Sequence, residues 1–543
     1  MPPQIDNLAG LDLLPDTIEV LRRIFARYKR VVIIKEFTAG LSGSRVLEVR
    51  PIKADGTPEL PTVVKLATVS MIEQEWHAYQ QHIHNRLPRS AGVAARPTVL
   101  AAAGWGGLRY PAMGSGSPDI LSLRDFCCQP DVSPSELALV FERLLRIMDN
   151  VWGYNAATPN FAMQASYAGV LPPQLLVRPA VPPEGAAITA ITPENPPTFA
   201  LRPGAAVALA GFAVRKVVPS HRTVSLGVTG ALAGGAAFSV RVRIPEAEPM
   251  PAYRSQELVD LPNAVVIETC AGRLRNEVAR LFVAVDPAAA LVPLAEGVWL
   301  PNPLNALPDL LRQPRNVNVA TIHGDFNLQN ILIEPQLGEI SLIDFAEARQ
   351  DHVLHDLLHL EAEILTHVLP EIIDQAQLDP LLAVVALSWH GRRALSQTTG
   401  DHGPPLHPAL RKLWVMLSAI RRAARGYLFD LNDPAEYYQG LTLYLLGALR
   451  YKNLGGFASR PLPKQIAFWA ATLTYHWLVQ AAAPTVAPEL EALLARAQAL
   501  WVAGAHPQGK ANRSRAVGEQ LPGSEARPDP MAVLPVDRIP PVR

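Results

Sequence analysis

The chain has 543 residues, of which 49 are Lys or Arg and 49 are Asp or Glu, so its formal net charge is zero. At ~100–200 residues per domain, this length predicts two to four folded units. A content of 49% hydrophobic and 18% charged residues excludes a largely disordered chain. A balanced charge offers nucleic acid no overall positive field. Three cysteines are too few for a disulfide framework, which favours a reducing compartment.

The sequence carries no export or membrane signal. The first ten residues, MPPQIDNLAG, lack the basic stretch and apolar run of a signal peptide. The most apolar runs, such as 203–214, are interrupted by Gly or Pro and fall short of the ~20 residues that a membrane-spanning helix needs. We therefore expect a cytoplasmic protein, with neither a membrane nor a nucleic acid as its partner.

Residues 11–152 are predicted to alternate between helices and short strands. In the first segment, Leu14 and Ile18 begin an apolar stripe at helical spacing. Ser133 or Ser135 is placed to cap the last helix of this part. The predicted helices cover 11–30, 71–85 and 134–152, and the predicted strands cover 31–37, 46–49, 62–66, 98–103 and 108–110.

Residues 153–305 differ from the preceding part in composition and hydrophobic pattern, and they are predicted to form an insertion. The chain contains 51 prolines, well above the usual ~5%, and Pro-rich stretches flank a β-patterned block at 198–246. Turn residues divide this block into three apolar segments, which predicts a small barrel or sandwich. Its arginines make the block locally basic. They indicate either an acidic ligand or scattered surface cations, and the insertion or the later helices could also recruit a protein partner.

The most informative segment is 321–349, which reads TIHGDFNLQNILIEPQLGEISLIDFAEAR. Two short apolar runs flank the turn residues 335–339, which is a hairpin signal. Asn330 and Asp344 lie symmetrically about the turn, so pairing is predicted to place them opposite each other at the open end. A carboxylate and a carboxamide there offer the hard oxygen ligands that Mg²⁺ prefers beside substrate phosphates. Asp325, in the irregular loop just before, is placed to approach the same end and accept a proton from a hydroxyl.

This pattern resembles the catalytic loop of the aminoglycoside phosphotransferase and protein-kinase-like superfamily. In that superfamily His-Gly-Asp-x-x-x-x-Asn precedes a hairpin that ends in Ile-Asp-Phe. The resemblance implies Asp325 as the catalytic base, Asn330 and Asp344 as Mg²⁺ ligands and His323 as a residue that organises the loop. The alternative is a plain hairpin with polar residues at its surface.

The superfamily also places a lysine and a glutamate upstream in a fixed order, and the sequence offers candidates for both. Lys65, on the predicted strand 62–66, would contact the α- and β-phosphates of ATP, although a strand lysine is often simply solvated at an edge. Glu75 would pair with this lysine because it lies beside the buried stripe of the predicted helix. Glu73, the alternative, lies further toward solvent.

Two further stretches would complete a nucleotide site. The turn that carries Gly40, Ser42, Gly43 and Ser44 could lay backbone N–H groups over phosphates, although most such turns merely connect strands. Met113 falls where members of the superfamily join two lobes and bind adenine through backbone groups.

A finer resemblance is to a bacterial family called the ternary complex associated domain. It rests on the Gly-Leu-Ser-Gly-x-x-Val turn at 40–46 and on the helical segments 418–424, 436–441 and 449–454. The resemblance implies a role in NTP-dependent bacterial conflict or signalling systems.

Together these resemblances imply an α+β protein with a bilobal, protein-kinase-like fold and a β-rich insertion in the helical lobe. The expected parts are an antiparallel-sheet N-lobe at 1–114, the first part of the helical C-lobe at 115–152, the insertion at 153–305, the catalytic loop, metal-binding hairpin and C-lobe helices at 306–503, and a disordered tail at 504–543.

The function these features predict is Mg-ATP-dependent transfer of a phosphoryl group to a hydroxyl of an acceptor, a small molecule or a protein. The alternative is a kinase-like adaptor that binds nucleotide without transferase activity, which the irregular Gly turn and the long insertion favour. An intact Asp325 argues against the adaptor, because a role limited to binding needs no base.

The segment after the hairpin contains polar residues for which the sequence allows two roles each. Asp356 resembles the aspartate that buttresses the catalytic loop in aminoglycoside-phosphotransferase-like proteins, and a helix N-cap explains it equally well. His352, His355 and His359 invite a zinc site, but HExxH is absent and the segment is expected to be the helix after the metal-binding loop.

Overall fold

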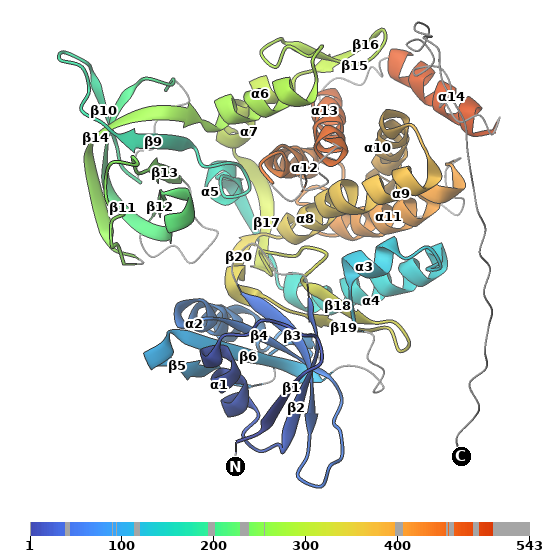
Figure 1. Ribbon diagram of the computed structural model, residues 1–543. Coiled ribbons are helices and arrows are strands. Elements are labelled where there is room, and N and C mark those ends of the chain that lie inside the picture. Colours follow the sequence, from blue (N-terminus) through green and yellow to red (C-terminus); the bar gives the residue numbers. More distant parts are fainter. Residues whose placement is uncertain are drawn as a thin grey trace, which may run out of the picture.

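The computed structural model of the chain describes residues 2–37, 44–88, 91–93, 95–112, 120–193, 201–228, 238–254, 256–396, 406–451, 454, 461–481 and 488–502. The fold is a mixed α+β one, in which an N-terminal sheet, a large helical region and a separate barrel can be told apart (Figure 1). The sheet lies below the helices in this view, and the barrel lies to their left.

The N-terminal sheet has six strands in the order β1-β2-β3-β4-β6-β5. Strand β4 (Thr62–Thr68) has both faces covered, and its side chains alternate between them. Val64 and Leu66 pack in one core with helix α1 (Pro15–Ile24), so Lys65 points to the opposite face. The other strands are β1 (Gln4–Asn7), β2 (Arg30–Phe37), β3 (Arg45–Ile52), β5 (Thr98–Leu100) and β6 (Trp105–Ala112).

The predicted helices of this part are present with shifted bounds. The first is α1, shorter than the predicted 11–30, and the second is α2 (Val69–Ala78), which continues as a π-helical turn at Tyr79–Ile83. The third, α4 (Pro134–Trp152), matches its prediction because Ser133 and Glu136 form a capping box at its start. A short helix α3 (Leu123–Cys128) precedes it.

Two small sheets frame the segment that the sequence analysis singled out. Strand β17 (Arg315–Ile322) is the centre of the sheet β20-β17-β8, and strand β18 (Ile331–Glu334) is the centre of the sheet β19-β18-β7. Strand β8 lies within the predicted insertion, yet it pairs with β17. The outer strands are β7 (Leu121–Ser122), β8 (Ala156–Phe161), β19 (Glu339–Leu342) and β20 (Arg349–His352).

The β-rich part of the predicted insertion is a closed ring of strands with its own core. The order is β11-β12-β13-β9-β14, and β14 pairs back onto β11. Only three of these strands fall in the block predicted at 198–246. The two that close the ring come before and after it, and local turn signals do not reveal such non-local pairing. The strands are β9 (Leu175–Pro179), β11 (Ala206–Val218), β12 (Thr223–Gly227), β13 (Val240–Arg243) and β14 (Leu258–Thr269), with β10 (Ile188–Ile191) added beside β11.

The helical region packs around α12 (Ala435–Ala448), every residue of which is buried. Its buried polar side chains make hydrogen bonds, among them those of Gln439 and Thr442, as a helix in the centre of a core requires. Across the described residues, no helix is long and apolar enough to cross a membrane. The remaining elements are α5 (Met163–Tyr167), α6 (Cys270–Leu281), β15 (Leu291–Ala295), β16 (Val298–Pro301), α7 (Pro303–Arg312), α8 (His355–Glu363), α9 (Leu369–Ala376), α10 (Pro380–Ser396), α11 (Arg411–Arg425), α13 (Leu462–Ala481) and α14 (Pro488–Val502).

Candidate functional site

Lys65 is the point at which the N-terminal sheet meets the hairpin. Its Nζ lies 2.8 Å from Oε2 of Glu75 and 2.7 Å from Oδ1 of Asp344. Burial lowers the pKa of this ammonium group, but the two carboxylates outweigh that effect and hold the pKa above its usual value. Lys65 is therefore a permanent cation. The alternative partner Glu73 is exposed, whereas Glu75 is fully buried.

Glu75 is held by donors from three elements. Besides Lys65, its carboxylate accepts hydrogen bonds from the Phe345 backbone N–H at 3.2 Å and from the Tyr110 hydroxyl. The same hydroxyl accepts the backbone N–H of Asp344 at 3.2 Å. Burial, and then the Glu75 carboxylate, raise the pKa of Tyr110 well above its usual value, so the hydroxyl keeps its proton. Sequence reasoning missed Tyr110, which no spacing rule connects to the hairpin.

Asp325 lies in a loop that its own polar neighbours hold in shape. Its Oδ1 accepts a hydrogen bond from Nδ2 of Asn327 at 3.1 Å, and its Oδ2 accepts one from Nδ2 of Asn330 at 3.0 Å. Oδ1 of Asn327 in turn accepts the backbone N–H groups of Gln329 and Asn330. Asn327 therefore orients both functional candidates, a role that its place two residues after Asp325 could have indicated.

Asp356 supports this loop from behind. Its Oδ1 accepts the backbone N–H of Gly324 at 2.9 Å, and its Oδ2 accepts the backbone N–H of His323 at 2.7 Å and the indole N–H of Trp152 at 2.9 Å. The N-cap of α8 is Leu354, which has no side-chain cap. Asp356 thus supports the loop through hydrogen bonds, as one of the two predictions has it, and it is not the N-cap of α8.

His323 lies beneath the loop and not at its surface. It is fully buried against Phe345 and Phe326, and its Nε2 lies 3.1 Å from the carbonyl oxygen of Ile343. This contact ties the loop to the end of the hairpin, so the position of His323 fits an organising residue and not one that contacts a substrate.

The hairpin differs from its prediction by one residue of register. Ile331 pairs with Leu342, so Asn330 lies opposite Ile343 and not opposite Asp344. The reason is a four-residue turn, 335–338, which shifts the axis of symmetry by half a residue. Asp344 follows the last paired position with φ +65° and leaves the strand there.

At the open end of the β18–β19 hairpin, two side-chain oxygens have no hydrogen-bond donor among the described residues and are of the type that binds a divalent cation. Asn330 uses its amide nitrogen on Asp325, which leaves its Oδ1 with no donor among the described residues, and Oδ2 of Asp344 is likewise without one there. Burial, and after it the charges of Asp325 and Asp344, raise the pKa of Glu347 to about 7 although Arg349 opposes them. Hard oxygen ligands amid accumulated negative charge are what Mg²⁺ binds. Glu347 was missed because nothing in its spacing separates it from a surface residue.

Of the other predicted site residues, the structure describes only Ser44. Gly40, Ser42, Gly43 and Met113 lie outside the described residues. Ser44, the first described residue after the turn, is buried.

The histidines after the hairpin form a structural network. His355 contacts the hydroxyls of Ser166 and Tyr444, and His352 contacts the hydroxyl of Tyr167 at 2.7 Å and Glu436 at 3.1 Å. Among the residues that the structure describes, no group of three or more His, Cys, Asp or Glu could hold a metal ion. The zinc reading is therefore not supported, and these side chains pack α5, α8 and α12 together.

The structure is thus a mixed α+β one in which the buried Lys65 contacts the carboxylates of Glu75 and Asp344, while Asn330 donates to the carboxylate of Asp325 in the loop before the hairpin. The family model described as "Ternary complex associated domain 9" matches residues 29–450. The chain therefore belongs to this family, and the family resemblance predicted from the sequence is confirmed.

Solved structures with likeness to this chain include two kinases. An amicoumacin kinase in complex with AMP-PNP, Ca²⁺ and Ami is 12% identical with a TM-score of 0.31, over 90% of this chain and 94% of that one. A thermostable mutant of aminoglycoside phosphotransferase APH(4)-Ia in its apo form is 13% identical with a TM-score of 0.33, over 86% of this chain and 99% of that one. No curated protein matches the chain.

Proposed function

We propose that the chain is a Mg-ATP-dependent phosphotransferase that acts on a hydroxyl of a small-molecule or protein acceptor. The observation that carries this proposal is the contact of Lys65 with both Glu75 and Asp344, beside a loop in which Asn330 orients Asp325. This set provides a cation for phosphates, oxygen ligands for a metal and a carboxylate for a hydroxyl proton.

The proposed site lies between two lobes, the N-terminal sheet and the helical region, and the barrel is an insertion in the second. Lys65 would hold the α- and β-phosphates from the side of the sheet, and Asn330 and Asp344 would hold Mg²⁺ from the side of the hairpin. Bound there, Mg²⁺ would neutralise charge on the β- and γ-phosphates.

Asp325 would act on the acceptor. Its carboxylate would accept the hydroxyl proton as the acceptor oxygen forms a bond to the γ-phosphorus and the bridging bond to the β-phosphate breaks, so ADP leaves. The hydrogen bonds from Asn327 and Asn330 fix this carboxylate before the acceptor arrives, which lowers the cost of orienting it.

The proposal is tested by ADP release and by transfer of labelled γ-phosphate to components of a cell extract, with and without Mg²⁺. We expect Mg²⁺-dependent turnover that falls by about 10²–10⁴-fold in Asp325→Asn and disappears in Asp344→Ala. The matched control is Asp131→Asn, an exposed carboxylate in the loop between α3 and α4. Turnover at the wild-type rate in Asp344→Ala would overturn the proposal.

The same experiment separates the enzyme from an adaptor. If Mg-ATP raises the melting temperature of the full chain while no phosphate reaches water or any component of the extract, the chain binds nucleotide without transferring it. The adaptor function would then replace the transferase.

A further inference from the structure

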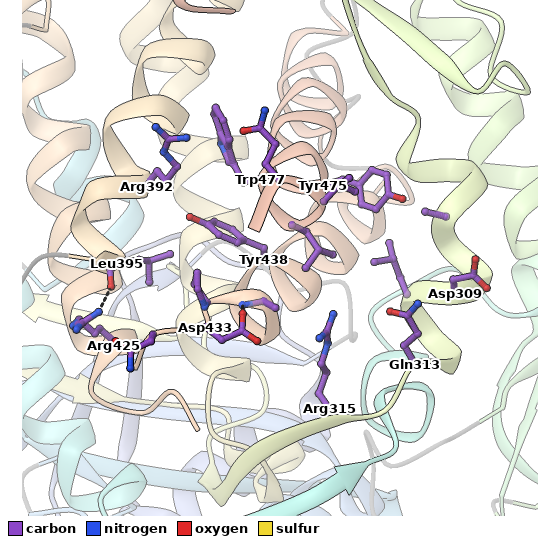
Figure 2. Close-up of a pocket in the computed structure, with 18 of the residues that line it drawn as sticks. Asp309, Gln313, Arg315, Arg392, Leu395, Arg425, Asp433, Tyr438, Tyr475 and Trp477 are labelled. Carbon is purple, nitrogen blue, oxygen red and sulfur yellow. Dashed lines mark hydrogen bonds between the residues drawn. The ribbon is translucent and has the colours of Figure 1, made fainter. Parts of the chain in front are cut away.

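A cavity lies among the helices, away from the site described above. Its volume is about 990 Å³, and it is bounded by α7, the start of β17, α10, the start of α12 and the ends of α11 and α13 (Figure 2). Pockets for small molecules occupy ~300–1,000 Å³, so a ligand of ordinary metabolite size would fit. Arg315 begins β17 at the cavity, and the same strand ends at Ile322, next to His323 of the catalytic loop. The two sites therefore lie at opposite ends of one strand.

Three guanidinium groups line this cavity without a carboxylate partner. Nη1 of Arg425 donates to the backbone carbonyls of Leu395 at 2.7 Å and Leu431 at 3.0 Å, and Nε of Arg315 donates to the side chain of Gln439. Neither group forms an ion pair within the described residues, and the same holds for the third, Arg392. Each arginine keeps N–H groups that these bonds do not use.

Neither carboxylate of the lining forms an ion pair with these arginines within the described residues. Asp309 pairs with Arg312 at 3.0 Å, and Asp433 accepts the backbone N–H of Ala435 at 2.9 Å. Figure 2 shows Asp309 across the cavity from Arg392 and Arg425. The lining therefore has three guanidinium groups against two carboxylates, one of which pairs with Arg312 outside the lining, so it keeps an excess of positive charge.

Aliphatic side chains and three aromatic rings form much of the rest of the lining. The guanidinium of Arg392 lies 4.6 Å from the ring centre of Trp477, which fixes its orientation. The hydroxyl of Tyr438 makes no hydrogen bond within the described residues, and Figure 2 places its ring between Arg392 and Arg315. Tyr475 lies on the opposite wall. Flat apolar surfaces beside fixed cations suit a ligand that has both a planar ring and an anionic group.

We propose that this cavity binds a small aromatic anion, whose carboxylate or phosphate lies against Arg392 and Arg425 and whose ring packs on Tyr475 and the apolar side chains beside it. Nothing in this proposal depends on nucleotide binding or on catalysis at the first site.

The test is calorimetric titration of the full chain with four probes: phenyl phosphate, benzoate, inorganic phosphate and phenol. We expect phenyl phosphate or benzoate to bind with one-to-one stoichiometry, and the tighter of the two identifies the anionic group. Inorganic phosphate and phenol, which each lack one half of the ligand, are expected to bind at least tenfold more weakly.

Variants locate the binding. Arg392→Gln is expected to weaken the tighter probe at least tenfold, and Arg422→Gln, an exposed arginine on the same helix as Arg425, is expected to change nothing. Tyr475→Leu, whose side chain makes no hydrogen bond within the described residues, is expected to weaken it several-fold and serves if Arg392→Gln fails to fold.

Three results would overturn the proposal. They are the absence of binding by both ring-bearing anions, equal affinity for inorganic phosphate and phenyl phosphate, and binding that survives in Arg392→Gln and Tyr475→Leu but is lost in Lys65→Met. The last result would place the anion at the first site.

Discussion

Nζ of Lys65 lies 2.7 Å from Oδ1 of Asp344, which joins the N-terminal sheet to the hairpin after the HGD loop. The lysine side chain is 3% exposed and that of Glu75, its second partner, is fully buried. Charges buried to this degree are stable only as a set, because each one alone would pay the full cost of desolvation. The ion pairs thus hold the N-terminal sheet against the hairpin, and they orient the lysine that is proposed to bind phosphates.

Replacing Lys65 by Met is expected to lower the free energy of unfolding by about 3–5 kcal/mol, because Glu75 is left buried without its cation. The measurement is chemical denaturation at neutral pH. Lys65→Met combined with Glu75→Gln is expected to recover part of the loss, since the uncompensated charge is gone. If Lys65→Met alone is as stable as the wild type, the ion pairs of Lys65 do not stabilise the fold.

Much of this site was predictable because order and spacing along the chain carry it. Lys65 faces inward because it alternates with Val64 and Leu66, and Glu75 is buried where Glu73 is not because it lies beside the apolar stripe of its helix. Both predictions rest on local periodicity, which a sequence displays directly.

What the sequence could not reveal is set by contacts between distant segments. The contact of the Tyr110 hydroxyl with Glu75 depends on how β6 lies against α2. The ring of the barrel closes through the parallel pairing of β13 with β9. The half-residue shift of the hairpin depends on a turn length that apolar runs alone do not fix.

Asp356→Asn tests the buttress. The new amide cannot accept all three hydrogen bonds that reach the carboxylate from His323, Gly324 and Trp152. We expect a loss of about 1–3 kcal/mol in unfolding free energy and faster hydrogen exchange at the amides of His323 and Gly324. Unchanged exchange at these two amides would contradict the role assigned to Asp356, and Asp131→Asn is the exposed control.

Gly324→Ala is expected to disrupt the loop. Gly324 has φ +83°, and a Cβ there would collide with the carbonyl oxygen of Glu347. Gly297→Ala is the matched control, because Gly297 has φ +76° but open space around it. The control should cost about 1 kcal/mol for backbone strain alone, and Gly324→Ala should cost clearly more in thermal unfolding. Equal costs would mean that the loop can move away from Glu347.

The free energy of unfolding is expected to depend on pH through the carboxyl group of Glu363. Burial, and then the charge of Asp325, raise the pKa of its carboxyl from 4.5 to about 8. The folded state therefore binds a proton that the unfolded state has lost between these values, so this group makes stability fall as pH rises from about 4.5 to about 8.

Glu363→Gln removes that contribution. Its unfolding free energy should exceed that of the wild type at pH above about 8, by on the order of 1–3 kcal/mol, and the difference should shrink toward pH 5. Denaturation at both pH values measures this, with the exposed Glu184→Gln as control. A difference that does not change with pH would contradict a neutral Glu363.

The most direct measurement is calorimetric titration of the full chain with ATP, with and without Mg²⁺, for the wild type and for Asp344→Asn. If Lys65, Asn330 and Asp344 meet at a metal-bound nucleotide, Mg²⁺ should tighten ATP binding at least tenfold in the wild type and have little effect in Asp344→Asn. An equal Mg²⁺ effect in both proteins, or no ATP binding by the wild type, would contradict the account.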